Sequence, residues 1–173
     1  MSGRRIAGAL AAAVVAMATP SVAQEPGSRP TREFVQAASQ SDAFEILEAQ
    51  TVLAQSTDAD LRGYAQAMIR DHMQLGDDLR QAVAGAGLKP PAMAVGADQA
   101  PLLAALQGLR GPAFDRAYVA HQALSHRAAL LVEQNYAAGG DDAGLRRVAA
   151  AAVPVVAAHL AAAERLQARR GGS

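Results

Sequence analysis

The sequence predicts an all-α fold, and three observations support that prediction. Alanine dominates an apolar fraction of 51%, and alanine is the strongest helix former. Aromatic residues make up only 3% of the chain, which disfavours the β-sandwiches and barrels that need aromatic and β-branched strands. Apolar residues also recur at spacings of three and four over four long stretches, as in amphipathic helices. The 173 residues are enough for one compact domain and a short targeting segment.

Charge and cysteine content exclude several kinds of partner and site. Sixteen basic residues balance sixteen acidic ones, so no strong positive field would draw the chain to nucleic acid. Cysteine is absent, which excludes disulfides, thiolate metal ligands and a cysteine nucleophile. We therefore expect no nucleic-acid partner.

The first 23 residues have the pattern of a cleaved signal peptide. Arg4 and Arg5 precede an apolar stretch at residues 6–19, Pro20 follows, and small residues lead to a cleavage site after Ala23. The alternative is an uncleaved anchor, but about 14 apolar residues are few against the ~20 needed to cross a bilayer. We expect a periplasmic protein whose mature chain has no transmembrane segment.

The first two helices are expected directly after a linker at residues 24–30. Thr31 can cap a helix that reaches about Gln55. Thr57 and Asp60 form a capping-box pattern that would open a second helix, to about Ala84. The residues expected to face inward from the first helix are Phe34, Ala38, Ser41, Glu45, Glu48 and Val52.

The second half of the chain predicts two more long helices, so that the bundle domain covers residues 31–170. Glycines and prolines punctuate residues 85–111, with room for one short helix at residues 101–109. A third helix would run from Pro112 to Gly139, and Asp141 or Asp142 would cap a fourth. Pro154 lies inside the fourth helix, where we expect a kink.

The lengths of the connections predict the topology. The first and last links are short, which makes each pair of flanking helices antiparallel, whereas the middle link is long enough to climb back along the bundle. A bundle with one long crossover is the ferritin-like arrangement. An up-down-up-down bundle is the alternative, but it would not need so long a link.

One candidate metal ligand lies on each long helix. Glu48, His72, His126 and His159 could converge inside the bundle, and imidazole with carboxylate suits zinc, iron or copper. His126 lies on only one of two apolar stripes of its helix, and Asp115 could orient it. Glu-x-x-His pairs are absent, which argues against a di-iron site.

Two alternatives to this mixed metal site stay open. The histidines could be structural, each at its own level of the bundle and bonded to a carbonyl, a tyrosine or a carboxylate. Met68 and His72 share a helix face and could bind copper, although methionine at this spacing is more often core filler.

Three ordered motifs resemble a family of exported bacterial proteins, the domain of unknown function 4142. They are residues 64–72, residues 114–119 leading to His126, and residues 153–160. The resemblance implies a ferritin-like four-helix bundle in the periplasm or at the outer membrane, with no agreed activity. The family usually has an acidic residue before the third-helix histidine, where this chain has Ser125. The residues carried over are Asp71, His72, Asp115, Tyr118, His126, Pro154 and His159.

Two functional hypotheses follow, and neither assigns a catalytic residue. The first is a non-enzymatic envelope protein that meets an unidentified protein partner, with a role in stress tolerance. The second is a metal-binding bundle that stores, buffers or redox-cycles zinc, copper or iron.

Overall fold

The structure, a computed structural model, describes residues 26–171 and is all-helical over that range. The expected signal peptide and its cleavage site after Ala23 lie outside the described residues. The all-α prediction is confirmed, including the short extra helix in the crossover. The helices are α1 (Arg29–Gln55), α2 (Ala59–Gly85), α3 (Ala100–Gly108), α4 (Gly111–Gly139) and α5 (Ala143–Gly171).

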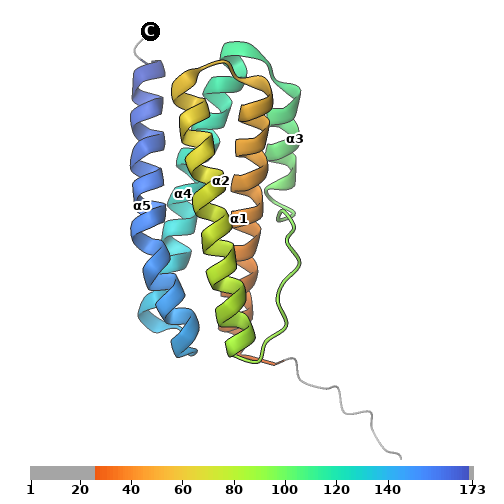
Figure 1. Ribbon diagram of the computed structural model, residues 1–173, viewed down its shortest axis with the longest axis vertical. Helices are drawn as coiled ribbons and strands as arrows, with labels where there is room; N and C mark the ends of the chain where they lie inside the picture. Colours follow the sequence, from red (N-terminus) through yellow and green to blue (C-terminus); the bar gives the residue numbers. More distant parts are fainter. Residues whose placement is uncertain (1–25, 172–173) are drawn as a thin grey trace, which may run out of the picture.

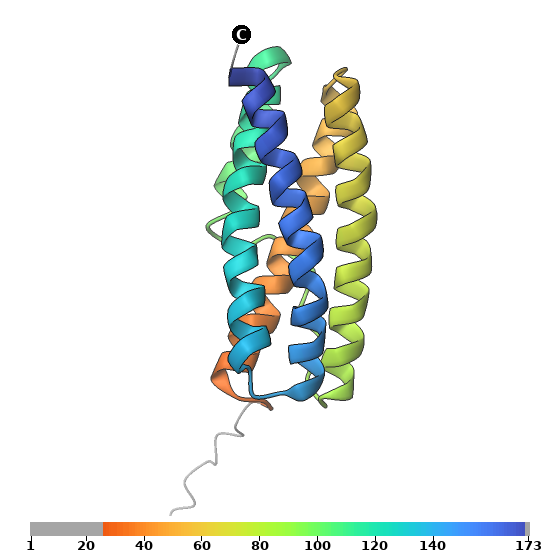
Figure 2. The same cartoon turned by 90° about the vertical axis from the view of Figure 1, so that its left-hand side faces the viewer.

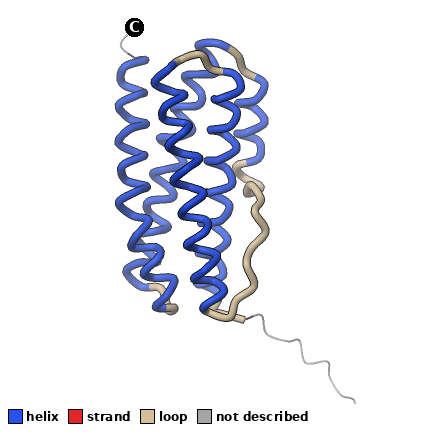
Figure 3. Tube along the Cα trace, viewed as in Figure 1, coloured by secondary structure: helices blue, strands red, loops and turns tan. Residues whose placement is uncertain are grey.

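The long helices form a bundle with one crossover, as the connection lengths predict. Figure 1 shows α1 running up, α2 returning down, and the segment before α3 climbing back beside α1. Helix α4 then runs down and α5 up; Figure 2 shows these two side by side. The tan connection in Figure 3 traces the crossover along the outside of the bundle. Helix α1 packs on α2 and α4, and α5 packs on α4 and α2, so every neighbouring pair of long helices is antiparallel.

The first helix begins three residues earlier than predicted. Arg29 opens α1, and the Ser28 hydroxyl accepts a hydrogen bond from the Thr31 amide at 3.1 Å. The predicted cap at Thr31 is therefore wrong. Serine and threonine are both good caps, and proline suits the first helical turn, so Pro30 fits inside the helix rather than before it.

The caps of α2 and α5 are aspartates. Asp58 accepts from the Leu61 amide at 2.9 Å, so the predicted capping box that starts at Thr57 is wrong. Asp142 caps α5 by accepting from the Leu145 amide at 2.8 Å, one of the two choices that the sequence left open. A carboxylate accepts amide hydrogens strongly and favours the positive end of the helix dipole.

Helix α5 continues through Pro154 without interruption. Proline removes one backbone hydrogen bond there, and the size of the bend stays a prediction. Within the described residues, α5 is also the one helix long and apolar enough, by length and composition, to cross a membrane. In the structure it is the fourth helix of the bundle, packed along α4 and α2.

The core has two apolar clusters with a polar layer between them. One cluster gathers around Leu61, Met68 and Tyr118, and the other around Phe34 and Leu145. Each long helix contributes to both clusters, with buried polar residues between; α1 and α5 run from the Phe34 cluster to the Leu61 cluster, and α2 and α4 run the opposite way. The buried polar residues between the clusters include Asp42, Glu45 and Glu48 on α1, His72 on α2, Gln122, His126 and Glu133 on α4, and His159 on α5.

Candidate metal centre

Three histidines from three helices meet in this polar layer. His72, His126 and His159 are 2%, 0% and 7% exposed, and their ring centroids are 5.3 to 5.6 Å apart. One nitrogen from each ring lies within 4.8 Å of the other two. Three points at that spacing lie within about 2.8 Å of a common centre (4.8/√3), against a Zn–N bond of about 2.1 Å. Small side-chain shifts would therefore complete a metal site.

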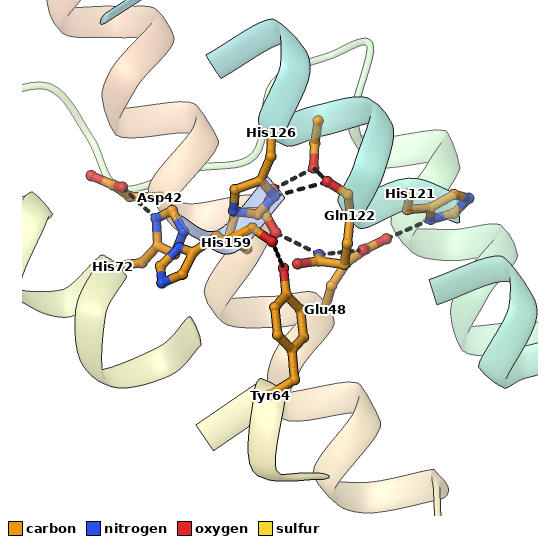
Figure 4. A network of polar contacts seen from close by, with 10 residues as sticks. Asp42, Glu48, Tyr64, His72, His121, Gln122, His126 and His159 are labelled. Atoms are coloured by element: carbon orange, nitrogen blue, oxygen red, sulfur yellow. Dashed lines mark hydrogen bonds and ion pairs between the residues drawn. The ribbon is translucent and has the colours of Figure 1, made fainter. Parts of the chain in front are cut away.

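One nitrogen of each ring is engaged in a hydrogen bond. His72 Nδ1 lies 2.8 Å from Asp42 Oδ1, and His159 Nε2 donates to Asp71 Oδ2 at 3.0 Å. His126 Nδ1 donates to the Gln122 carbonyl at 2.9 Å. These bonds orient the rings, as carboxylates and carbonyls do for metal-bound histidines. Figure 4 shows the His72 and His126 contacts and the three rings gathered together.

The nitrogens that remain have no hydrogen-bond partner among the described residues. They are His72 Nε2, His126 Nε2 and His159 Nδ1, and all three are inaccessible to solvent. A buried polar atom without a partner costs about 1–3 kcal/mol. Three rings that meet at one place, each with such an atom, form a candidate ligand set for a metal ion.

Burial keeps two of the three rings neutral. It lowers the pKa of His126 to about 3 and that of His159 to about 4, with the charge of His72 adding to both shifts. Burial also lowers the pKa of His72, but the hydrogen bond with Asp42 and the charge of Glu45 outweigh it and raise that pKa. Neutral imidazole is the form that ligates metals, and His126 and His159 are held in that form.

Glu48 is not part of this cluster, which corrects the predicted four-ligand set. Its carboxylate is fully buried but accepts from His121 Nδ1 at 2.7 Å and from the Gln122 amide at 3.2 Å. The hydrogen bond to Glu48 raises the pKa of His121. A buried carboxylate needs hydrogen-bond donors. For Glu48 these donors are His121 and Gln122 of α4, on the side of the carboxylate away from the three rings.

Glu45 links this second network to the metal centre. It accepts from the Gln122 amide and the Ser125 hydroxyl, both at 2.5 Å, and one of its oxygens lies 3.7 Å from His126 Nδ1. Burial raises the pKa of Glu45. Ser125, where the resembled family usually has an acid, therefore donates to an acid that α1 provides.

The remaining motif residues lie outside the three-histidine cluster. Asp115 accepts from Ser56 Oγ at 2.8 Å, so the prediction that it orients His126 is wrong. Eleven positions separate the two on one helix, about 16 Å at 1.5 Å per residue, which is too far for contact. Tyr118 is fully buried in the apolar cluster around Leu61 and Met68. Asp71 accepts the hydrogen bond from His159 described above.

Two functional residues were missed from the sequence. Asp42 supports His72, and its spacing from Ala38 and Glu45, four and three residues, was the signal that could have placed it inside. Gln122 donates to both inward glutamates and offers its carbonyl to His126, and it lies four residues before that histidine.

Comparisons with known proteins identify a similar fold in one case and the family in another. A crystal structure of a DUF305 fragment from Deinococcus radiodurans superposes with a TM-score of 0.72, at 16% identity, over 83% of this chain and 99% of that one. At that identity the likeness shows the fold alone. No curated protein matches this chain. The family described as "Domain of unknown function (DUF4142)" matches residues 16–166, and the chain belongs to that family.

Proposed function

We propose that this protein binds one transition-metal ion per chain through His72, His126 and His159. The observation that carries the proposal is the convergence of the three rings: one nitrogen of each lies within 4.8 Å of the other two, and each ring has a buried nitrogen without a partner among the described residues. Structural histidines were expected at separate levels of the bundle. These lie at one level, and over residues 26–171 each ring has a hydrogen-bond partner for only one of its two nitrogens.

The ligand set favours zinc or copper over iron. Three imidazoles suit all three metals, but iron sites in helical bundles take several carboxylate ligands. Here the carboxylates of Asp42 and Asp71 lie behind the rings, where they would offset the charge of the ion. Three protein ligands also leave a fourth position for water or another small ligand.

Holding and releasing the ion fits this site better than turnover of a large substrate. All three rings are at most 7% exposed, so only an ion and small ligands could reach them. We propose storage or buffering of the metal as the role, with tolerance of metal stress as its consequence.

The compartment is a further part of the proposal. The expected cleavage after Ala23 would release the bundle into the periplasm, free or against the outer membrane, with α5 kept in the bundle. Mass spectrometry of the periplasmic protein should find an N-terminus at Gln24, and a carbonate wash should release any membrane-bound fraction. An uncleaved chain that resists carbonate would contradict this.

The metal proposal is tested by the metal content of protein exported to the periplasm and titrated with zinc, copper and iron. Wild type should hold about one equivalent, and a His72→Ala/His159→Ala variant should hold none. His121→Ala is the matched control, because it removes a histidine of α4 outside the cluster. Circular dichroism checks that each variant is folded, and His126→Gln provides a smaller change at the same site. Equal metal content in all four proteins would end the proposal.

A further inference from the structure

The three-histidine centre is closed, so an ion needs a route to it. Two cavities lead towards it from the face between α1 and α4. The outer one is a groove of about 240 Å³ beneath the start of α3, with His121 and Leu124 on its wall. The inner one, about 20 Å³, lies at the bundle axis and reaches Asp42 and His72.

A thin wall separates the groove from the inner cavity. Four residues line both spaces: Ala38 and Ser41 from α1, and Ala129 and Glu133 from α4. Three of these side chains are small, so little has to move to connect the two spaces. Glu133 is the one carboxyl group of the wall.

Glu133 is unusual for a buried acid. It is 8% exposed, and its Oε2 atom has no hydrogen-bond partner among the described residues. Burial and the charge of Asp42 raise its pKa to about 8. Among the residues that the structure describes, neither an ion pair nor a hydrogen bond explains a carboxyl group there, whereas a cation would be a suitable partner for its oxygens.

We propose, on the basis of the metal-binding function above, that ions reach the centre through the α1–α4 groove and that Glu133 receives them first. The carboxyl group gives up its proton to solvent when it binds the ion. The ion then passes through the inner cavity to His72, and Glu133 takes up a proton again. Glu133 is thus a temporary ligand on the route and not part of the final site.

The opposite side of the bundle offers a larger groove but no comparable passage. That groove, about 580 Å³ between α2 and α5, shares only Leu75 and Val148 with the inner cavity. Two branched apolar side chains provide no ligand for a partly dehydrated ion. Ala151 lines this groove and offers a matched control position.

The test measures how fast Co²⁺ binds to the complete mature protein after its metal has been removed. The visible absorption of Co²⁺ reports its ligation. Glu133→Gln removes the carboxylate, and Ala129→Leu narrows the wall without a change in charge. Both should slow loading about tenfold or more and leave the final stoichiometry unchanged. Glu164→Gln, an exposed acid, and Ala151→Leu are the controls, and both should load like wild type.

Three results would overturn the route. Loading of either Glu133→Gln or Ala129→Leu at the wild-type rate would show that ions take another path. Loss of bound cobalt at equilibrium in Glu133→Gln would make this residue a permanent ligand. If wild type itself binds no cobalt, zinc or copper, the proposed function fails, and the route with it.

Discussion

His126→Gln provides a quantitative test of the buried neutral histidines. The pKa of His126 is lowered to about 3, mainly by burial and then by the charge of His72, against about 6.5 in an unfolded chain. Between these values the unfolded chain binds a proton that the folded chain does not, so stability falls as the pH is lowered. From pH 6.5 to pH 5 the loss is about 2 kcal/mol, since each unit is worth about 1.4 kcal/mol.

The substitution His126→Gln removes the imidazole ring and with it this loss of stability at low pH. Glutamine is uncharged at both pH values, so the stability gap between wild type and His126→Gln should narrow by about 2 kcal/mol from pH 7.5 to pH 5. Urea unfolding of the metal-free proteins, followed by far-UV circular dichroism in the presence of a chelator, measures the gap. An equal gap at both pH values would refute a buried neutral ring at position 126.

His121→Gln is the matched control, and the stability gap to wild type should change with pH in the opposite direction. The hydrogen bond to Glu48 raises the pKa of His121, so this ring contributes stability below the unfolded pKa and loses it as the pH rises through the folded one. The gap between wild type and His121→Gln should therefore widen from pH 7.5 to pH 5. A general effect of acid on the bundle would move both gaps in the same direction.

Three further predictions concern single positions. Glu133 keeps its proton up to a pKa of about 8, so Glu133→Gln should gain about 3 kcal/mol relative to wild type between pH 5 and pH 7.5; a pH-independent difference in urea unfolding would contradict this. Gly76→Ala should raise the free energy of unfolding by about 0.5–1 kcal/mol, because its new Cβ meets nothing closer than 3.5 Å. Gly140→Ala should lower the free energy of unfolding by about 1–3 kcal/mol, because its Cβ would lie 2.5 Å from the Tyr136 ring. Changes of the same sign in the two variants would refute the packing argument. Pro154→Ala should straighten α5, and unchanged helix geometry in crystals of the variant would refute the expected kink.

The arrangement of helices was predictable because it depends on local signals. The three-and-four spacing of apolar residues marks each long helix, and the glycines and prolines of residues 85–111 mark the long link. The caps were less predictable, since Ser28 and Thr31 are equally good candidates on chemistry alone. Which of the two residues caps α1 depends on where the backbone changes from extended to helical, and this happens at Ser28.

The candidate site was predictable only in part, for a physical reason. His72 and His159 lie on clean apolar stripes, so their burial follows from periodicity, whereas His126 lies on one of two competing stripes. Glu48 was assigned to the wrong cluster because spacing shows that a side chain faces inward but not which helix it meets. Its contact with His121 depends on the rotation of α4, which packing against α1 and α5 determines.

Anomalous scattering from crystals of the zinc-loaded protein tests the central claim most directly. We predict a single strong zinc peak per chain, about 2.1 Å from His72 Nε2, His126 Nε2 and His159 Nδ1. A map with no peak among these three rings, or with zinc only at surface carboxylates, would contradict a metal centre inside the bundle.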